Sequence, residues 1–165
     1  MREVSKDDKL FFFERSFFTL DGLWMIETEN FTDFDTALEI DIVVWQRLYS
    51  TIFRRVKRYL KLENNGISDL VEILSFCWSC EGYEYEILKN EEKEAIMHIT
   101  KCPYIEIMER NPERLEKIGA ICEIMCIPFF EKPIKEFNSD IEIKRNEFMG
   151  TGGKVCDFQL KLLDK

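Results

Sequence analysis

The sequence is poor in histidine, glutamine and basic charge, and each shortage narrows what the chain can do. A single histidine among 165 residues removes most histidine-based catalytic arrangements from consideration. Only two glutamines accompany abundant lysine and glutamate, a bias associated with thermophilic organisms. The 32 acidic and 23 basic residues give a net charge of −9, which argues against a nucleic-acid partner because phosphate neutralisation requires a basic face.

Long hydrophobic runs are also missing. No segment reaches the roughly 18 uncharged apolar residues that a membrane-spanning helix requires, and the first residues lack the apolar core of a signal peptide. We therefore expect a cytoplasmic protein, whose thiols stay reduced. Hydrophobic residues make up 45% of the chain and charged residues 33%, which predicts one globular domain over residues 1–165.

The first half of the sequence has helical periodicity. Aromatic and aliphatic residues crowd positions 11–26, with Gly22 as the weak point of a first helix. Thr36 and Glu39 form a capping-box pattern, which predicts that a second helix starts near Thr36 and ends before the Asn-Asn-Gly at 64–66. A shorter helix is expected at about 68–76.

The second half alternates between polar and apolar residues, as strands do. Strands are expected at 83–87, 94–101, 141–148 and 155–163, with the last two joined by a turn at 150–153. Pro103 ends the second strand at Cys102, and Pro112 opens a helix that Pro128 and Pro133 end or kink. The sequence thus predicts an α+β fold in which N-terminal helices pack on an antiparallel sheet.

The sequence contains six cysteines, many more than its single histidine. Cys77 and Cys80 have the Cys-x-x-Cys spacing of half a zinc site, but no second such pair exists and Trp78 lies between them. We expect these two cysteines to pack in the core. The same packing role is open to the other four, because free cysteine is among the most buried residue types.

The other four cysteines suggest a metal site more strongly. Cys122 and Cys126 are four residues apart and share one face of a predicted helix. Cys102 ends a strand, and Cys156 begins the inward-facing series of the last strand. Zinc needs four ligands in a tetrahedron, so the sequence predicts a site at Cys102, Cys122, Cys126 and Cys156, with packing as the alternative.

Other catalytic patterns are weak or missing. His98 lies within a strand among apolar residues and is expected to be a core or edge residue. The sequence has no Ser-His-Asp arrangement, phosphate loop or His-Glu-x-x-His motif. The glycines at 150–153 lack the lysine and the following helix of a phosphate site, so they read as a turn.

Two stretches of the sequence resemble known families. The segment from Leu20 to Trp24, continuing through residues 37–45, is similar to proteins grouped with 2-aminothiazoline-4-carboxylate hydrolase. Residues 100–104, Cys122 and the Gly-x-Gly-Gly-x-x-Cys-x-Phe ending at 150–158 fit the same group. That ending, and the chain as a whole, also resemble the vinyl-4-reductase domain family of methanogen type.

The resemblance implies an α+β fold related to haem-nitric-oxide sensors and vesicle-tethering subunits, an apolar ligand pocket and a homodimer. In some members it also implies a zinc ion, whose last ligand matches Cys156 and whose first matches Cys122. Zinc-binding members carry Glu-x-x-Cys shortly before the glycines, where this sequence has Arg145 and Phe148. Cys102 and Cys126 are then the expected replacements.

Three functions remain open at this stage. The first is a non-catalytic binding domain for a small apolar or amphiphilic molecule, with a structural zinc held by cysteines. The second is a metal- or thiolate-dependent hydrolase resembling the thiazoline-carboxylate group. The third is a subunit that only dimerises. The absence of a dinucleotide-binding fingerprint argues against reductase activity by this chain alone.

Overall fold

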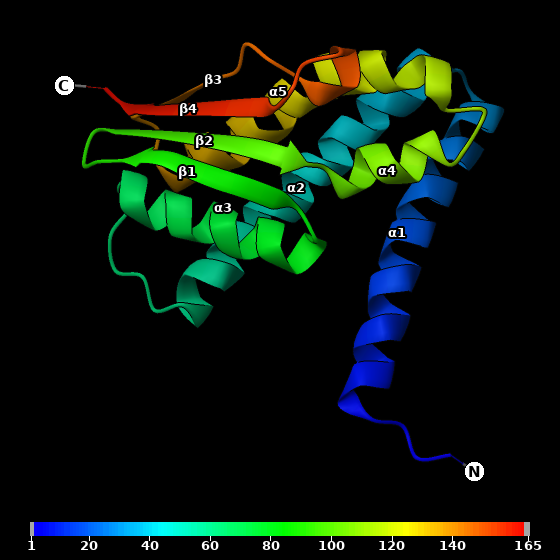
Figure 1. The fold of residues 1–165 in the computed structure, drawn as a ribbon, viewed down its shortest axis with the longest axis horizontal. Coiled ribbons are helices and arrows are strands. Elements are labelled where there is room, and N and C mark those ends of the chain that lie inside the picture. The colour runs from blue at the N-terminus through cyan, green and yellow to red at the C-terminus, as the bar shows by residue number, and fades with distance from the viewer. Residues whose placement is uncertain (1, 164–165) are drawn as a thin grey trace. The chain divides into compact units, whose positions relative to one another are not determined.

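A computed structural model describes residues 2–163. The chain divides into two compact units, residues 1–41 and 42–165. The elements in chain order are α1 (Lys6–Phe31), α2 (Phe34–Tyr59), α3 (Ile67–Glu81), β1 (Glu84–Asn90), β2 (Glu94–Lys101), α4 (Pro103–Glu109), η1 (Leu115–Lys117), α5 (Ile118–Phe137), β3 (Ile141–Lys144), η2 (Met149–Thr151) and β4 (Cys156–Leu162) (Figure 1). Among the described residues, no helix is long and apolar enough to cross a membrane.

The four strands form one antiparallel sheet in the order β1-β2-β4-β3, which confirms the predicted α+β class (Figure 1). β2 and β4 are central, with Met97 opposite Phe158 and Ile99 opposite Cys156. Alternate residues of both strands are buried, as the predicted inward series of Cys156, Phe158 and Leu160 requires. α3 packs against β1, β2 and β4, and α5 packs against β3.

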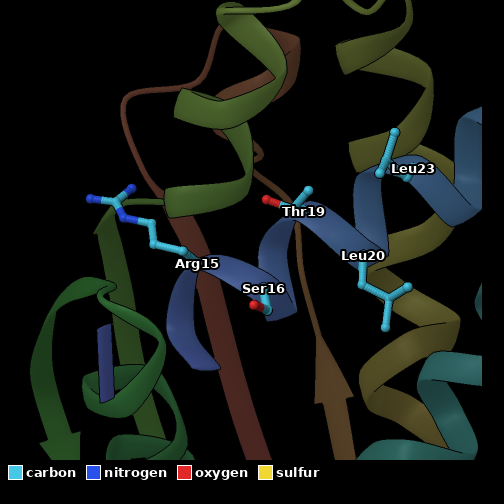
Figure 2. Close-up of a pocket in the computed structure, with 5 residues that line it drawn as sticks. All are labelled: Arg15, Ser16, Thr19, Leu20 and Leu23. Atoms are coloured by element: carbon cyan, nitrogen blue, oxygen red, sulfur yellow. The ribbon is translucent and has the colours of Figure 1, made fainter. Parts of the chain in front are cut away.

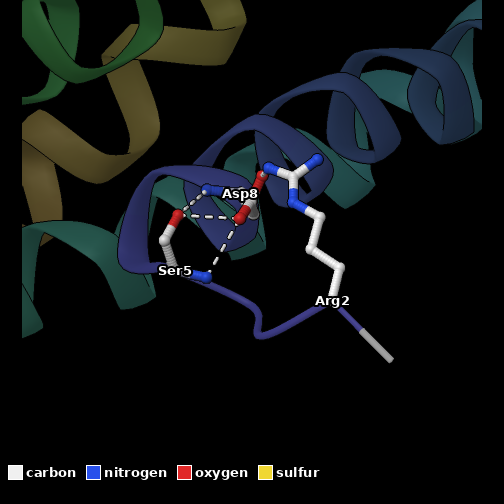
Figure 3. A network of polar contacts seen from close by, with 3 residues as sticks. All are labelled: Arg2, Ser5 and Asp8. Atoms are coloured by element: carbon white, nitrogen blue, oxygen red, sulfur yellow. Dashed lines mark hydrogen bonds and ion pairs between the residues drawn. The ribbon is translucent and has the colours of Figure 1, made fainter.

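α1 starts with a complete capping box. The Ser5 side chain accepts a hydrogen bond from the Asp8 backbone N–H, and the Asp8 carboxylate accepts one from the Ser5 backbone N–H (Figure 3). The hydrogen bonds from Ser5 also lower the pKa of Asp8. The helix runs without a break through Gly22, so a single glycine with open space around it does not interrupt α1.

A seam of exposed apolar residues runs along α1. Its members alternate at spacings of three and four residues: Leu10, Phe13, Phe17, Leu20 and Trp24. Their exposed fractions range from 38% to 67%. This spacing is the heptad pattern of helices that pair side by side.

α2 begins two residues earlier than predicted, and its cap is Asp33 instead of Thr36. The Asp33 carboxylate accepts hydrogen bonds from the Thr36 N–H at 2.9 Å and from the Thr36 hydroxyl at 3.0 Å. An aspartate satisfies the free N–H groups of the first turn as well as a threonine does, and it suits the helix dipole better. The helix ends at Tyr59, before Lys61 adopts the left-handed conformation (φ 57°).

α3 is longer than the predicted 68–76. It continues through both cysteines of the Cys-x-x-Cys pair to Glu81 and ends at Gly82, which has φ 84°. A left-handed glycine is the usual stop after a helix, so Gly82 was the better end signal. The extension puts Trp78 and Glu81 on the same helix.

Pro103 follows the end of β2 as predicted, but Pro112 does not open a helix and Pro128 and Pro133 do not end one. Pro103 opens the short helix α4, since a proline in the first turn lacks only an N–H that has no helical partner. Pro112 does not open a helix, because α5 starts at Ile118 after η1. Pro128 and Pro133 both lie inside α5 and do not end it. Gln46 of α2 donates a side-chain hydrogen bond to the Pro128 carbonyl at 2.8 Å, which ties α2 to α5.

The connection between β3 and β4 is an irregular loop with one 3₁₀ turn, not a simple hairpin. β3 ends at Lys144, four residues before the predicted end at 148. The Asp157 carboxylate accepts hydrogen bonds from the backbone N–H groups of Asn146 at 2.7 Å and Glu147 at 2.8 Å. These hydrogen bonds pair backbone N–H groups of the loop that would otherwise pair with a neighbouring strand.

Candidate functional site

Trp78 is the centre of an aromatic interior in the unit of residues 42–165. Its side chain has an exposed fraction of 0%. The ring centroid of Phe158 lies 4.8 Å from that of Trp78, the centroid of Tyr85 5.4 Å and that of Phe130 6.3 Å. Further rings extend the cluster toward α2, where Tyr49 lies 4.5 Å from Phe129. The interior therefore offers aromatic faces and edges from four elements: α2, α3, α5 and the sheet.

The indole N–H of Trp78 has no hydrogen-bond partner among the described residues, although it is fully buried. Burying such a donor without an acceptor costs roughly 1–3 kcal/mol. Buried polar groups in folded proteins are nearly always paired, so an unpaired one points to a bound water or ligand.

A polar group lies beside the aromatic interior at the C-terminal end of α3. The Glu81 carboxylate accepts a hydrogen bond from the Tyr49 hydroxyl at 2.6 Å and another from the Tyr104 hydroxyl at 3.3 Å. Burial, followed by the Glu81 charge, raises the pKa of Tyr49 well above its usual value. The Tyr49 phenol therefore stays protonated at neutral pH, and both hydroxyls act as donors to Glu81. Tyr83, whose ring lies 6.0 Å from that of Tyr104, adds a third phenol.

The structure brings together the four cysteines that the sequence singles out. Cys102 precedes the first turn of α4, Cys122 and Cys126 lie on α5, and Cys156 begins β4. Cys122 interacts electrostatically with each of the other three thiols. Burial raises the pKa of Cys102 to about 12, so this side chain is a neutral thiol at physiological pH.

Cys122 and Cys126 form a hydrogen-bonded pair within the cluster. The bond from the Cys122 thiol, together with the charge of Arg145, lowers the pKa of Cys126 to about 6 against the effect of burial. The same bond raises the pKa of Cys122. Cys156 accepts a hydrogen bond from the Met149 backbone N–H at 3.2 Å, and this fixes the sulfur at the start of η2.

The cluster does not fit a zinc ion as it stands. Among residues 2–163, no three His, Cys, Asp or Glu side chains are placed to hold a metal. The Arg145 guanidinium hydrogen-bonds to Cys126 and Cys156. Its fixed positive charge would repel a zinc ion bound to these cysteines. Zinc at Cys102, Cys122, Cys126 and Cys156 stays a prediction that the structure does not support.

The Cys-x-x-Cys pair is split by the helix that carries it. Cys77 is buried in the core, as predicted, while Cys80 is exposed. Burial raises the pKa of Cys77 to about 12, which makes it a packing residue and not a nucleophile. His98 lies half-buried in β2 at a position that alternates with the buried Met97 and Ile99.

The sequence analysis gives no site role to three residues: Trp78, Glu81 and Arg145. Trp78 and Glu81 lie beyond the predicted end of their helix at residue 76, so the sequence did not indicate that one helix carries both. Arg145 had a signal, because it follows Ile141 and Ile143 in the alternation of β3 and should therefore point inward. An inward arginine after two isoleucines indicates a buried cation that needs partners.

Comparison with known proteins places this geometry in a family. The family of L-2-amino-thiazoline-4-carboxylic acid hydrolase matches residues 33–160. The chain belongs to this family. The match supports the resemblance to the thiazoline-carboxylate group, whereas the vinyl-4-reductase resemblance stays a prediction, and the Leu20–Trp24 segment lies outside the match. A comparison with curated proteins finds no match.

A solved structure supports the fold of this family member. The phenol-responsive sensory domain of the transcription activator PoxR, crystallised with phenol, is similar with a TM-score of 0.55. The two sequences are 11% identical, and the similarity covers 88% of this chain and 73% of the sensory domain. At this identity the likeness concerns the arrangement of helices and strands.

Proposed function

We propose that the chain is a non-catalytic binding domain for a small apolar or amphiphilic molecule. The observation that carries this proposal is the buried, unpartnered indole N–H of Trp78 at the centre of the aromatic interior. The ligand is a flat, mostly apolar molecule with one acceptor atom, which takes the free N–H while the surrounding rings contact its faces. The phenol-bound state of the similar sensory domain supports this ligand class.

The Glu81 group sets the polar end of the proposed site. Its carboxylate already accepts from Tyr49 and Tyr104, so the two hydroxyls can turn toward a ligand at the expense of those bonds. An amphiphilic molecule would meet the rings with its apolar part and this group with its polar part.

The test is a thermal-shift and fluorescence titration with phenol, indole and octanoate. Wild-type protein is expected to gain several degrees in melting temperature with at least one of the three probes, because a ligand at about 100 times its Kd stabilises by roughly 2.7 kcal/mol. Trp78→Phe keeps an aromatic ring, although a smaller one, and removes the N–H, so it should weaken binding about tenfold. Trp24→Phe, at an exposed position on α1, is the matched control and should bind as the wild type does. No response to any probe would contradict the proposal.

The family name suggests hydrolysis of a cyclic amidine as a second function. Burial raises the pKa of both Cys77 and Cys102 to about 12 and leaves them weak nucleophiles, so Cys126, whose pKa is lowered, is the thiol that such a reaction would use. We expect no release of ring-opened product from L-2-amino-thiazoline-4-carboxylate above the uncatalysed rate. Turnover that is lost in Cys126→Ser would instead establish the hydrolase.

The proposed binding domain acts as a homodimer, and the seam of α1 supports this. Five apolar side chains at heptad spacing lie exposed on one helix. Beside them, Arg15, Ser16, Thr19, Leu20 and Leu23 line a hollow of about 330 Å³ (Figure 2). All five side chains come from successive turns of α1, so the hollow has the form of a hole that a side chain from a second helix fills.

A further inference from the structure

Arg145 places a guanidinium group inside the molecule, where its side chain is held from two elements. The residue has an exposed fraction of 9%. Its Nε donates a hydrogen bond to the Asp157 carbonyl at 3.0 Å, and its Nη1 donates one to the Cys126 carbonyl at 3.3 Å. The first acceptor belongs to β4 and the second to α5, so one side chain joins the sheet to the helix.

Aromatic rings surround the same guanidinium. Its central carbon lies 4.0 Å from the ring centroid of Phe158, 4.6 Å from that of Phe148 and 5.8 Å from that of Phe130. A cation over an aromatic face is attracted to the electron-rich ring, and most strongly where water is excluded. The rings therefore compensate part of the cost of burying the charge, and they fix the plane of the guanidinium.

The guanidinium also touches the cysteine cluster. It hydrogen-bonds to the thiols of Cys126 and Cys156. Arginine keeps its proton at any physiological pH, so this positive charge cannot be removed to admit a metal ion. Zinc needs its thiolates at about 2.3 Å in a tetrahedron and would face the charge at close range.

We propose that Arg145 takes the structural place of a metal ion in this cluster. Its guanidinium clamps α5, β4 and the β3–β4 loop together, and the cluster does not take up zinc. Phe148 belongs to the same clamp, because its ring centroid lies 4.6 Å from the central guanidinium carbon of Arg145.

Metal analysis of wild-type protein purified without chelators tests the proposal directly. We expect zinc far below one per chain after incubation with excess zinc and desalting, and the same melting temperature with and without EDTA. One zinc per chain, with a melting temperature that falls on addition of EDTA, would overturn the proposal.

Substitutions at Arg145 test the clamp itself. Arg145→Met should lower the melting temperature by about 5–10 °C, because two buried carbonyls lose their donor. Arg145→Lys should recover only part of the loss, since lysine keeps the charge but lacks the planar fork. Arg55→Met, at an exposed position of α2, is the matched control and should leave the melting temperature unchanged. An unchanged melting temperature in Arg145→Met would contradict the clamp, and if this variant fails to fold the wild-type metal analysis still decides.

A gain of zinc binding is the sharpest outcome. The double variant Arg145→Glu with Phe148→Cys removes the cation and adds two ligand side chains beside Cys122 and Cys156. This variant is expected to bind about one zinc per chain, which raises its melting temperature, while Arg145→Met alone is expected to bind none. A folded double variant that binds no zinc would count against Arg145 as the group that keeps the metal out.

Discussion

Asp157 shows how much of the β3–β4 loop depends on one residue. Its carboxylate accepts hydrogen bonds from two backbone N–H groups and from the side chains of Asn146 and Gln159. Burial alone would raise the pKa of Asp157, but these hydrogen bonds outweigh it and lower the pKa. The carboxylate is therefore a fixed acceptor that supports the segment carrying Arg145.

The lowered pKa of Asp157 predicts a pH-dependent contribution to stability. A carboxyl group with a depressed folded-state pKa stabilises the fold fully above its unfolded value of about 3.9, and this contribution is lost as the pH falls through the lower folded value. Asp157→Asn should lower the free energy of unfolding at pH 7 by about 2 kcal/mol. Urea unfolding at pH 7 and pH 3 measures the difference from wild type, which should shrink at the lower pH. A difference that grows toward acid would contradict this role.

At the level of single residues, the periodicity of the sequence predicted which side chains are buried, but it did not predict their chemical roles as well. The inward series of β4 followed directly from alternate apolar positions, and the four clustered cysteines were singled out by their places on strand and helix. The Arg145 contacts were not predictable, because they require a backbone carbonyl of α5 and one of β4 to lie close together in the folded chain. No residue spacing in the sequence indicates that tertiary arrangement.

α5 and η2 pack closely against each other beside the cysteine cluster. A Cβ atom at Gly150 would lie 2.3 Å from the Cys122 sulfur, 2.8 Å from its Cβ and 3.2 Å from Ile118 Cγ2. No side chain fits in that space, so the glycine is required by the close approach of η2 to α5.

Gly150→Ala is accordingly predicted to be strongly destabilising. The new methyl group must push η2 away from α5, at a cost of about 2–3 kcal/mol in the free energy of unfolding. Gly22→Ala is the matched control, because nothing lies within 4 Å of a Cβ at that helical position. It should be neutral or stabilise by up to about 1 kcal/mol. Chemical denaturation of both variants measures the contrast, and equal stabilities would show that η2 moves freely.

Element boundaries were harder to predict than element types. The sequence signals at Thr36 and Pro112 were genuine cap patterns, but Asp33 caps α2 two residues earlier, and α5 starts at Ile118, after η1, without a side-chain cap. Local patterns of this kind are satisfied at several positions, and tertiary packing selects among them. Pro128 and Pro133 stay inside α5 because packing of Phe129, Phe130 and Ile134 outweighs the missing hydrogen bonds.

For the molecule as a whole, we propose that the seam of α1 pairs with the seam of a second copy. The 26-residue helix exposes Leu10, Phe13, Phe17, Leu20 and Trp24, and contiguous exposed apolar surface marks an interaction site. The division of the chain at residue 41 and the nature of the ligand could not be predicted from the sequence, because both depend on how packed surfaces meet. The prediction of one domain over residues 1–165 stays a prediction.

Light scattering after size-exclusion chromatography tests the dimer. Wild-type protein is expected at twice the chain mass, and the double variant Phe17→Glu with Leu20→Glu at the chain mass, because charges in the seam repel across it. Phe11→Glu is the matched control, because Phe11 is exposed on α1 outside both the seam and the hollow, and it should leave the dimer intact. A wild-type protein that elutes at the mass of one chain would contradict the proposed dimer.

The edges of the sheet give the mode of association a further constraint. β1 is an outer strand whose pairing with β2 shifts register twice, between Glu84 and Tyr85 and between Ile87 and Lys89. Irregular pairing and alternating charges prevent a second sheet from adding to that edge. β3, the strand at the opposite edge, has only four residues. Growth by strand addition, the route to fibrils, is therefore discouraged at both edges. We expect copies of the chain to associate as pairs and not as polymers.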